Sequence, residues 1–277
     1  MFVSTREILT QNKVVPAFNF ATAEVARAIV EVCDSLGQDV ILQTSMGEAK
    51  FLSPEVAVGI AKALGQQAKI LVSLHLDHAK DLKIIKAALK AGYTSLLADG
   101  SSLSFEESIR FTNEVRELAS EEIVVEVSLT EFNRAAELVK KVKPDLLAPF
   151  EIEGGRDKTK IEKIKKVSQL TTTPLVLHNS SSKSDREIKE ASALGVVKIN
   201  WNTCLREVWS KVLRQTLSSY PNEIKPYNIL EGSAKAVGLV VKEKIKMLNE
   251  SQASKIPNSK SQLPNNNQIP NSNNQTG

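Results

Sequence analysis

The sequence predicts an α/β protein with the (β/α)8 TIM-barrel fold, because three observations agree. Short apolar runs alternate with amphipathic segments of helical period, eight such pairs follow one another, and 277 residues suit a barrel built as one domain. A doubly wound open sheet is the alternative, and the count of eight units disfavours it. We expect residues 1–250 to form the barrel domain and residues 251–277 to form a separate tail.

Each predicted strand is a short run rich in Val, Ile and Leu, as buried parallel strands are. In chain order these runs are 14–20, 39–44, 70–76, 95–98, 123–127, 145–150, 174–178 and 196–200. The helical segments that follow them are 23–36, 54–64, 81–91, 105–119, 135–142, 161–170, 185–194 and 205–217. An additional C-terminal helix is expected over 232–248, after the barrel.

Signals at the helix ends agree with this division. Ser53 before Pro54 predicts a helix start, and Ser184 with Glu187 three residues later has the spacing of a capping box. Four glycines follow apolar helical runs, where a left-handed cap favours a residue without a Cβ: Gly37, Gly65, Gly92 and Gly195.

The composition is that of an ordinary soluble protein and excludes several classes. A net charge of +4, with Lys and Glu interleaved along the helices, argues against a nucleic-acid partner. The two cysteines, Cys33 and Cys204, exclude a disulfide framework and a cysteine-built zinc site. We expect a cytoplasmic protein without a signal peptide or membrane partner, and a disordered tail rich in Asn, Gln, Ser and Pro over 251–277.

The segment LHLDH at residues 74–78 is the most informative part of the chain. It places one acid and two of the three histidines at the end of a predicted strand. Because side chains alternate along a strand, His75 and Asp77 should share one face, while His78 points the other way or marks the turn. A solvated strand end is the plain alternative, but His is the commonest metal ligand.

In a barrel of this kind the active site forms where the strands end. Every predicted strand carries a polar residue at or just after this end: Asn19, Ser45, Asp77, His78, Asp99, Glu126, Glu151 or Glu153, His178, Asn200 and Asn202. His178 closes its strand as His78 does, so the two imidazoles could face one metal. A catalytic zinc takes three protein ligands, so the third would be a carboxylate or be missing.

Six segments resemble the class II, metal-dependent fructose-bisphosphate and tagatose-bisphosphate aldolases. They are VPAFN (15–19), VILQTS (40–45), LHLDH (74–78), DGSSLSFEE (99–107), PLVLH (174–178) and KINWNT (198–203). They occur in the family's order and at about its spacing, from Met1 to about Glu250.

The resemblance implies zinc-dependent, reversible cleavage of a ketose phosphate to dihydroxyacetone phosphate and an aldehyde, within carbohydrate metabolism. It implies His78 and His178 as metal ligands, Asp77 as the acid at the aldehyde oxygen, and Asn200 as a residue that holds the reacting substrate. It places the substrate at Asn19, Ser45, Asn179, Ser180, Asn202 and Thr203. A sugar phosphate as partner and a homodimer or larger homo-oligomer are also implied.

Three departures from the family pattern stand out. The resemblance implies that the mobile loop carrying the family's glutamate base is deleted after Glu126, where the chain runs directly into a predicted helix. The family's third histidine ligand is absent near Ala148, and Glu153 could take its place. The glycine-rich phosphate loop has become Asn179-Ser180-Ser181-Ser182, which should weaken or reshape phosphate binding.

Two functions therefore stay open from the sequence: an aldehyde-lyase that is slow or acts on an altered substrate, and an inactive barrel that binds a metabolite or serves assembly. Single residues also have structural alternatives. Asp99 could form only a turn and helix cap, Glu126 could pair with a lysine inside the barrel, and His75 could make a structural hydrogen bond. Trp201 and Trp209 are expected to pack rather than bind substrate.

Overall fold

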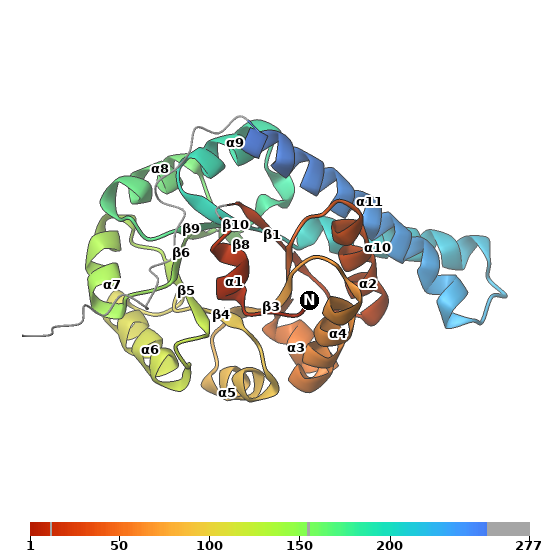
Figure 1. Cartoon of the computed structure of the whole chain (residues 1–277), viewed down its shortest axis with the longest axis horizontal. Helices are drawn as coiled ribbons and strands as arrows, with labels where there is room; N and C mark the ends of the chain where they lie inside the picture. Colours follow the sequence, from red (N-terminus) through yellow and green to blue (C-terminus); the bar gives the residue numbers. More distant parts are fainter. Residues whose placement is uncertain (12, 154–155, 254–277) are drawn as a thin grey trace, which may run out of the picture.

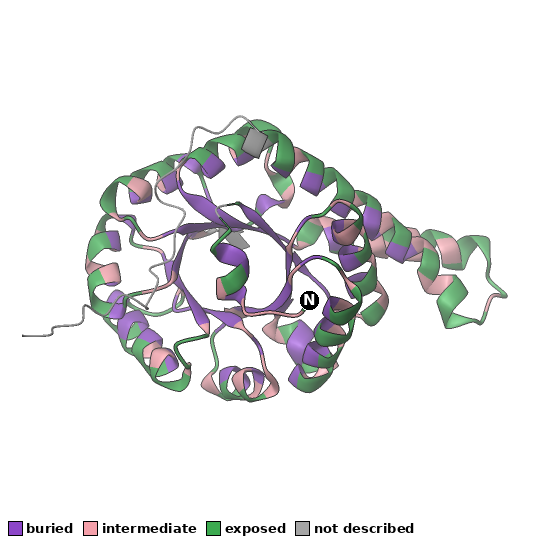
Figure 2. Cartoon of the chain, viewed as in Figure 1, coloured by how far each residue is buried: buried purple, intermediate pink, exposed green. Residues whose placement is uncertain are grey.

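The computed structural model describes residues 1–11, 13–153 and 156–253, with backbone only for 152–153, 156–158 and 251–253. Eight parallel strands close into a barrel in the order β1-β10-β9-β6-β5-β4-β3-β2, and helices surround them (Figure 1). The predicted fold is confirmed. The barrel wall is almost wholly buried, whereas the outer faces of the helices are exposed (Figure 2).

All eight predicted strands form, with boundaries shifted by a few residues. They are β1 (Val15–Asn19), β2 (Val40–Ser45), β3 (Val72–Ala79), β4 (Ser95–Ala98), β5 (Val124–Leu129), β6 (Leu146–Pro149), β9 (Leu175–Leu177) and β10 (Val196–Trp201). The outer helices are α2 (Ala23–Ser35), α4 (Pro54–Gln67), α5 (Leu82–Ala91), α6 (Phe105–Leu118), α7 (Ala135–Val142), α8 (Ile161–Leu170), α9 (Asp185–Ala193) and α10 (Thr203–Ser219).

The structure also contains short elements that the sequence patterns did not predict. They are α1 (Thr5–Leu9), α3 (Met46–Leu52), the antiparallel pair β7 (Glu151–Glu153) and β8 (Arg156–Lys158), and the 3-10 turns η1 (Phe132–Arg134) and η2 (Ser180–Ser182). Each is too short to show a clear hydrophobic period, which explains why the pattern missed them.

Helix α1 closes the amino-terminal end of the barrel, where Figure 1 shows it inside the ring of strands. Thr5 is fully buried there, and its hydroxyl lies 3.1 Å from Ser73 Oγ, 2.8 Å from Thr94 Oγ1 and 2.9 Å from Ser95 Oγ. These hydroxyl groups are hydrogen-bonded to one another, and Ile8 and Leu9 of the same helix pack against apolar residues of the strands. The site must therefore lie at the other end.

The predicted helix ends are mostly confirmed. Ser53 and Ser184 accept the backbone N–H groups expected of N-caps, and Gly37, Gly92 and Gly195 have positive φ. Gly65 is the exception, because it lies inside α4 rather than after it. A Cβ there would lie 2.8 Å from the backbone nitrogen of Phe2, so close packing, not a cap, requires this glycine.

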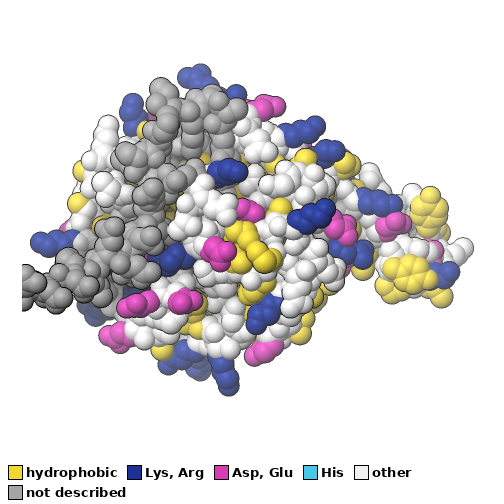
Figure 3. Space-filling view, viewed as in Figure 1, with side chains coloured by type: hydrophobic (Ala, Val, Ile, Leu, Met, Phe, Trp, Pro, Cys, Tyr) yellow, Lys and Arg dark blue, Asp and Glu magenta, His cyan; other side chains and the backbone are white. Residues whose placement is uncertain are grey.

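Helix α10 and the long helix α11 (Pro226–Ala253) form a hairpin arm that projects from the barrel (Figure 1). Helix α11 is longer than the predicted 232–248, and its end overlaps the first three residues of the predicted tail; residues 254–277 lie outside the described part. Hydrophobic side chains gather at the tip of the arm (Figure 3), among them Tyr220, Ile224 and Tyr227. Among the described helices none is long and apolar enough to cross a membrane.

Candidate metal centre and active site

Asp77, His78 and His178 come together at the carboxyl end of the barrel. Each offers one ligand atom, and these three atoms lie within 4.8 Å of one another. The two imidazole rings meet edge to face, at an interplanar angle of 78° with centroids 5.0 Å apart. The two histidines that the sequence expected at one metal therefore lie close together.

A backbone irregularity allows two successive residues of β3 to reach this cluster. His78 has φ of +52°, and the pairing of β3 with β4 shifts register between Leu76 and Ala79. Simple alternation would send Asp77 and His78 to opposite faces of the strand. A non-glycine residue at positive φ is uncommon, and such outliers gather at functional sites.

His78 is oriented by Asp99, which follows β4. His78 Nδ1 lies 2.8 Å from Asp99 Oδ2, and Asp99 Oδ1 accepts the backbone N–H of Ser101 at 2.9 Å. Burial raises the pKa of Asp99, but the hydrogen bond and charge of His78 outweigh it and hold that pKa well below its usual range. Because an ionised carboxylate only accepts, His78 donates to Asp99 through Nδ1. Asp99 thus both stabilises its turn and orients His78.

His178 is oriented in the same way by Glu126 of β5, deeper in the barrel. His178 Nε2 lies 2.7 Å from Glu126 Oε1, and Lys198 Nζ of β10 donates to Glu126 Oε2 at 2.9 Å. Burial raises the pKa of Glu126, but the charge of Lys198 and the hydrogen bond from His178 bring it well below its usual range. His178 therefore donates through Nε2, and Nδ1 is the ring nitrogen not bonded to Glu126. The predicted pairing of Glu126 with a lysine inside the barrel is confirmed.

His75 makes structural hydrogen bonds, which was the alternative that the sequence left open for this residue. Its Nδ1 lies 2.9 Å from Ser95 Oγ and its Nε2 lies 3.3 Å from Lys198 Nζ. Burial, followed by the charge of Lys198, lowers the pKa of His75 well below its usual value. Since an ammonium group only donates, the neutral ring accepts through Nε2 and donates through Nδ1.

The residues at the cluster fit a divalent metal. Asp77 Oδ1 is buried without a hydrogen-bond partner among the described residues, and it lies 3.8 Å from His78 Nε2. Two imidazole nitrogens and one carboxylate oxygen form a ligand set that zinc accepts, and both imidazoles have the carboxylate partners that metal-binding histidines usually have. Glu153, the predicted third ligand, lies on β7 and its side chain is outside the described residues.

The predicted substrate residues line neighbouring strand ends. Asn200 on β10 places its amide nitrogen 3.3 Å from His178 Nε2, and its Oδ1 has no hydrogen-bond partner among the described residues. Asn19 is held between Gln43 Nε2 at 2.6 Å and Glu48 Oε2 at 2.8 Å. Its position is therefore fixed before any ligand binds.

Ser45 has a local role as well, because its hydroxyl caps α3 and its backbone N–H donates to Glu48 Oε2 at 2.6 Å. Arg206 of α10 pairs with the other oxygen of Glu48, at 2.5 Å. Sequence reasoning missed Gln43, Glu48, Arg206 and Lys198, although Gln43 and Lys198, polar residues inside apolar strand runs, gave a signal.

The segments predicted to bind phosphate lie side by side after β9 and β10. Asn179 keeps the left-handed conformation, with φ of +52°, without being a glycine. Ser181 Oγ accepts the backbone N–H of Cys204 at 3.2 Å, in the first turn of α10. The N–H groups of Leu205 and Arg206 bond to the Asn202 carbonyl. Two N–H groups of the first turn that could face an anion, those of Cys204 and Leu205, are thus already occupied within the chain.

The chain after β5 follows the sequence prediction. Strand β5 is followed within a few residues by η1 and α7, so no long loop is inserted there. Phe132 of η1 is buried, which fixes this connection against the barrel.

Comparisons with known proteins agree with this architecture. The family model described as fructose-bisphosphate aldolase class-II matches residues 4–253. A fructose-bisphosphate aldolase from Geobacillus stearothermophilus is 30% identical over 269 residues, covering 86% of this chain and 94% of that protein. A sulfofructosephosphate aldolase from Alkalicoccus urumqiensis is 27% identical over 258 residues, covering 84% and 90%. The crystal structure of the YdjI aldolase from Escherichia coli K12 has a TM-score of 0.77 at 28% identity, covering 92% of this chain and 100% of that one.

Proposed function

This chain belongs to the class II fructose-bisphosphate aldolase family, and from that premise we propose that it is an aldehyde-lyase acting on a ketose phosphate. The reaction is the reversible aldol cleavage to dihydroxyacetone phosphate and an aldehyde. The observation that carries the proposal is the convergence of Asp77, His78 and His178 at one end of the barrel.

We propose that His78 and His178 hold a divalent metal, zinc in the first place, with Glu153 as the third ligand and Asp77 beside them. Such a metal supplies Lewis-acid polarisation of the substrate carbonyl. The contacts of His78 with Asp99 and of His178 with Glu126 fix the orientation of the two rings for this purpose.

Asp77 is the group we propose to exchange a proton with the hydroxyl oxygen at the bond that breaks. Its unpartnered Oδ1 is available for that oxygen. Asn200, beside His178, would donate its amide N–H to an oxygen of the reacting substrate. Asn19 and Ser45 bind the sugar in this proposal, and Asn179, Ser180, Asn202 and Thr203 bind its phosphate.

Turnover of fructose 1,6-bisphosphate is expected to be slow. A positioned general base contributes about 10² to 10⁴ in rate, and the loop that carries it in the family is missing here. The occupied N–H groups at the start of α10 argue further for weakened phosphate binding. The substrate is then a ketose with a different anionic end or a single phosphate.

Two measurements test this function. Metal analysis of protein purified without chelator should give one divalent metal per chain, and His178→Ala should lose it. A coupled assay for triose phosphate, run on fructose 1,6-bisphosphate and on the sulfofructose phosphate that one relative's name specifies, should favour the second. Ordinary family turnover on fructose 1,6-bisphosphate, with kcat on the order of 1 to 10³ s⁻¹, would contradict the slow-enzyme proposal.

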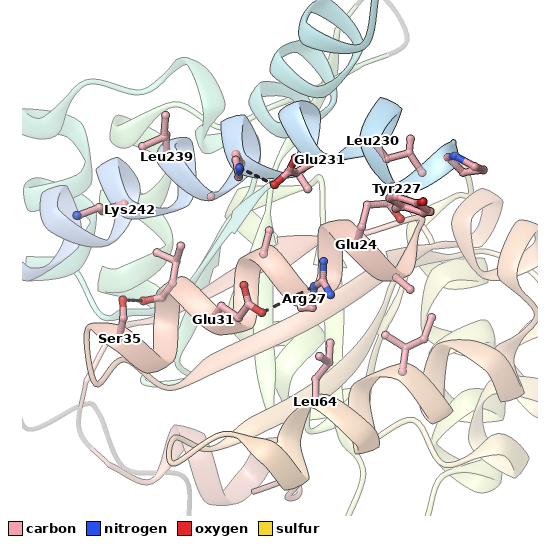
Figure 4. A pocket seen from close by; sticks show the side chains of 18 of the residues that line it. Glu24, Arg27, Glu31, Ser35, Leu64, Tyr227, Leu230, Glu231, Leu239 and Lys242 are labelled. Carbon is pink, nitrogen blue, oxygen red and sulfur yellow. Dashed lines mark hydrogen bonds and ion pairs between the residues drawn. The ribbon is translucent and has the colours of Figure 1, made fainter. Parts of the chain in front are cut away.

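We also propose that the chain forms a homodimer or larger homo-oligomer in the cytoplasm. A surface groove of about 1350 Å³ runs between α2, α4 and α11. Figure 4 shows Tyr227, Leu230 and Leu239 on the α11 side and Leu64 on α4. With the apolar tip of the arm, this groove leaves a large hydrophobic surface exposed, as interfaces do. Light scattering should give at least twice the chain mass, and Ile224→Asp with Tyr227→Asp should lower it to one chain.

A further inference from the structure

Lys198 is a fully buried cation in the barrel interior, and the proposed chemistry does not use it. Its Nζ lies 2.9 Å from Glu126 Oε2 and 3.3 Å from His75 Nε2. A buried ion pair is often no more stable than apolar residues of similar volume. Stability alone is therefore a weak reason for a lysine at this position, and its partners suggest a better one.

Glu126 links Lys198 to the metal cluster through two different oxygens. Oε2 accepts from Lys198 at 2.9 Å, and Oε1 accepts from His178 Nε2 at 2.7 Å. A carboxylate bound at both oxygens cannot rotate without breaking one of these bonds. The ammonium group thus fixes the acceptor that in turn fixes the ring of His178.

The same network continues away from the site to the closed end of the barrel. Lys198 contacts His75, His75 Nδ1 contacts Ser95 Oγ, and Thr5 of α1 donates to that hydroxyl at 2.9 Å. All of these side chains are buried. These buried contacts hold the Lys198 side chain in place, so it can fix the position of Glu126 and, through it, of His178.

We propose that Lys198 is a positioning residue that acts through Glu126 to hold His178 as the Nε2–H tautomer, with Nδ1 directed to a divalent cation. The inference rests on the proposed role of His178 as a metal ligand. Partners of this kind orient ligands, and their loss typically weakens metal binding by about 10- to 100-fold.

The chain contains a matched control at the rim of the same site. Lys80 Nζ lies 3.4 Å from Asp99 Oδ2, the oxygen that accepts from His78. The Lys80 side chain is 39% exposed, whereas that of Lys198 is 0% exposed. Water can replace Lys80, whereas the Lys198 side chain is out of contact with solvent. Only the loss of Lys198 should therefore weaken metal binding strongly.

The test compares Lys198→Met, Lys198→Met with Glu126→Gln, and Lys80→Met in the full-length protein. The double variant removes the buried negative charge together with the positive one, so it should fold even if Lys198→Met does not. Zinc affinity is measured by competition with a chromophoric chelator. We expect both Lys198 variants to bind zinc about 10- to 100-fold more weakly and Lys80→Met to change affinity by less than about fivefold.

A second readout needs no metal. Nitrogen-15 NMR of the three histidines, recorded on metal-free protein, reports the tautomer of each ring. His178 should be a single Nε2–H tautomer in the wild type and a mixture in the double variant. Wild-type zinc affinity together with an unchanged tautomer in the double variant would overturn the inference. A wild type that binds no zinc would overturn the metal centre instead, while the NMR result would still decide the role of Lys198.

Discussion

The two histidines of the metal cluster have partners of the same kind, but the lysine at the end of each series lies in different surroundings. His78 bonds to Asp99 and Asp99 pairs with Lys80, while His178 bonds to Glu126 and Glu126 pairs with Lys198. The first series lies at the rim, where His78 is 24% exposed; the second lies in the barrel interior, with Glu126 and Lys198 fully buried. The comparison shows how the strength of one arrangement, histidine to carboxylate to lysine, depends on whether water reaches the lysine.

At the rim, Lys80 is exposed, so solvent screens its charge and can take its place beside Asp99, which is itself buried. Inside the barrel a lost partner leaves an uncompensated charge, which costs far more. We therefore expect the buried series to determine both metal affinity and stability, and the rim series to adjust them.

The largest expected effect comes from removing the buried ligand itself. His178→Ala should lose the bound metal and reduce aldol cleavage by about 10³-fold or more, since metal polarisation is worth several kcal/mol of transition-state stabilisation. Metal content and steady-state rates on the best substrate would be measured together. An unchanged rate in the variant would show that His178 is outside the metal centre.

The next effect is on folding, and it contrasts the two lysines directly. Lys198→Met should lower the free energy of unfolding by about 3–5 kcal/mol, because it leaves the buried carboxylate of Glu126 without its cation. Lys80→Met should change it by about 1 kcal/mol or less. Urea unfolding in the presence of chelator measures both, and equal losses in the two variants would break the comparison.

A smaller effect concerns acid. Burial and Lys198 lower the pKa of His75, so the unfolded chain binds a proton below about pH 6.5 that the folded chain refuses. The neutral His75 side chain therefore costs the fold no stability above that pH, and the free energy of unfolding declines as the pH falls below it. Glu126 and Asp99, whose pKa values are also lowered in the fold, add further losses below about pH 4.5.

Unfolding followed between pH 8 and 4, without metal, should therefore give a free energy that falls toward acid. His75→Gln should flatten the decline between pH 6.5 and 4.5, because glutamine has no proton to take up. A decline of the same slope in this variant would assign the acid sensitivity to other groups.

The sequence predicted the strands and the outer helices well because their hydrophobic periods are long and regular. It could not predict α1 or α3, since helices of 5 and 7 residues show too little period. The histidine cluster was predictable because motifs at strand ends meet at one end of a parallel barrel.

The partners inside the barrel were harder to predict. Lys198 lies 72 residues from Glu126, and no local pattern joins them. The register shift that turns His78 toward Asp77 was equally hidden, since it depends on the pairing of β3 with β4. Contacts between distant strands are set by the closed sheet as a whole.

The central claim is a divalent metal centre at Asp77, His78 and His178, and zinc titration of the metal-free protein by calorimetry tests it most directly. The account predicts one zinc per chain in the wild type, no zinc in His178→Ala, and full stoichiometry in Lys80→Met. A wild type without zinc binding, or a His178→Ala variant that binds zinc as the wild type does, would contradict it.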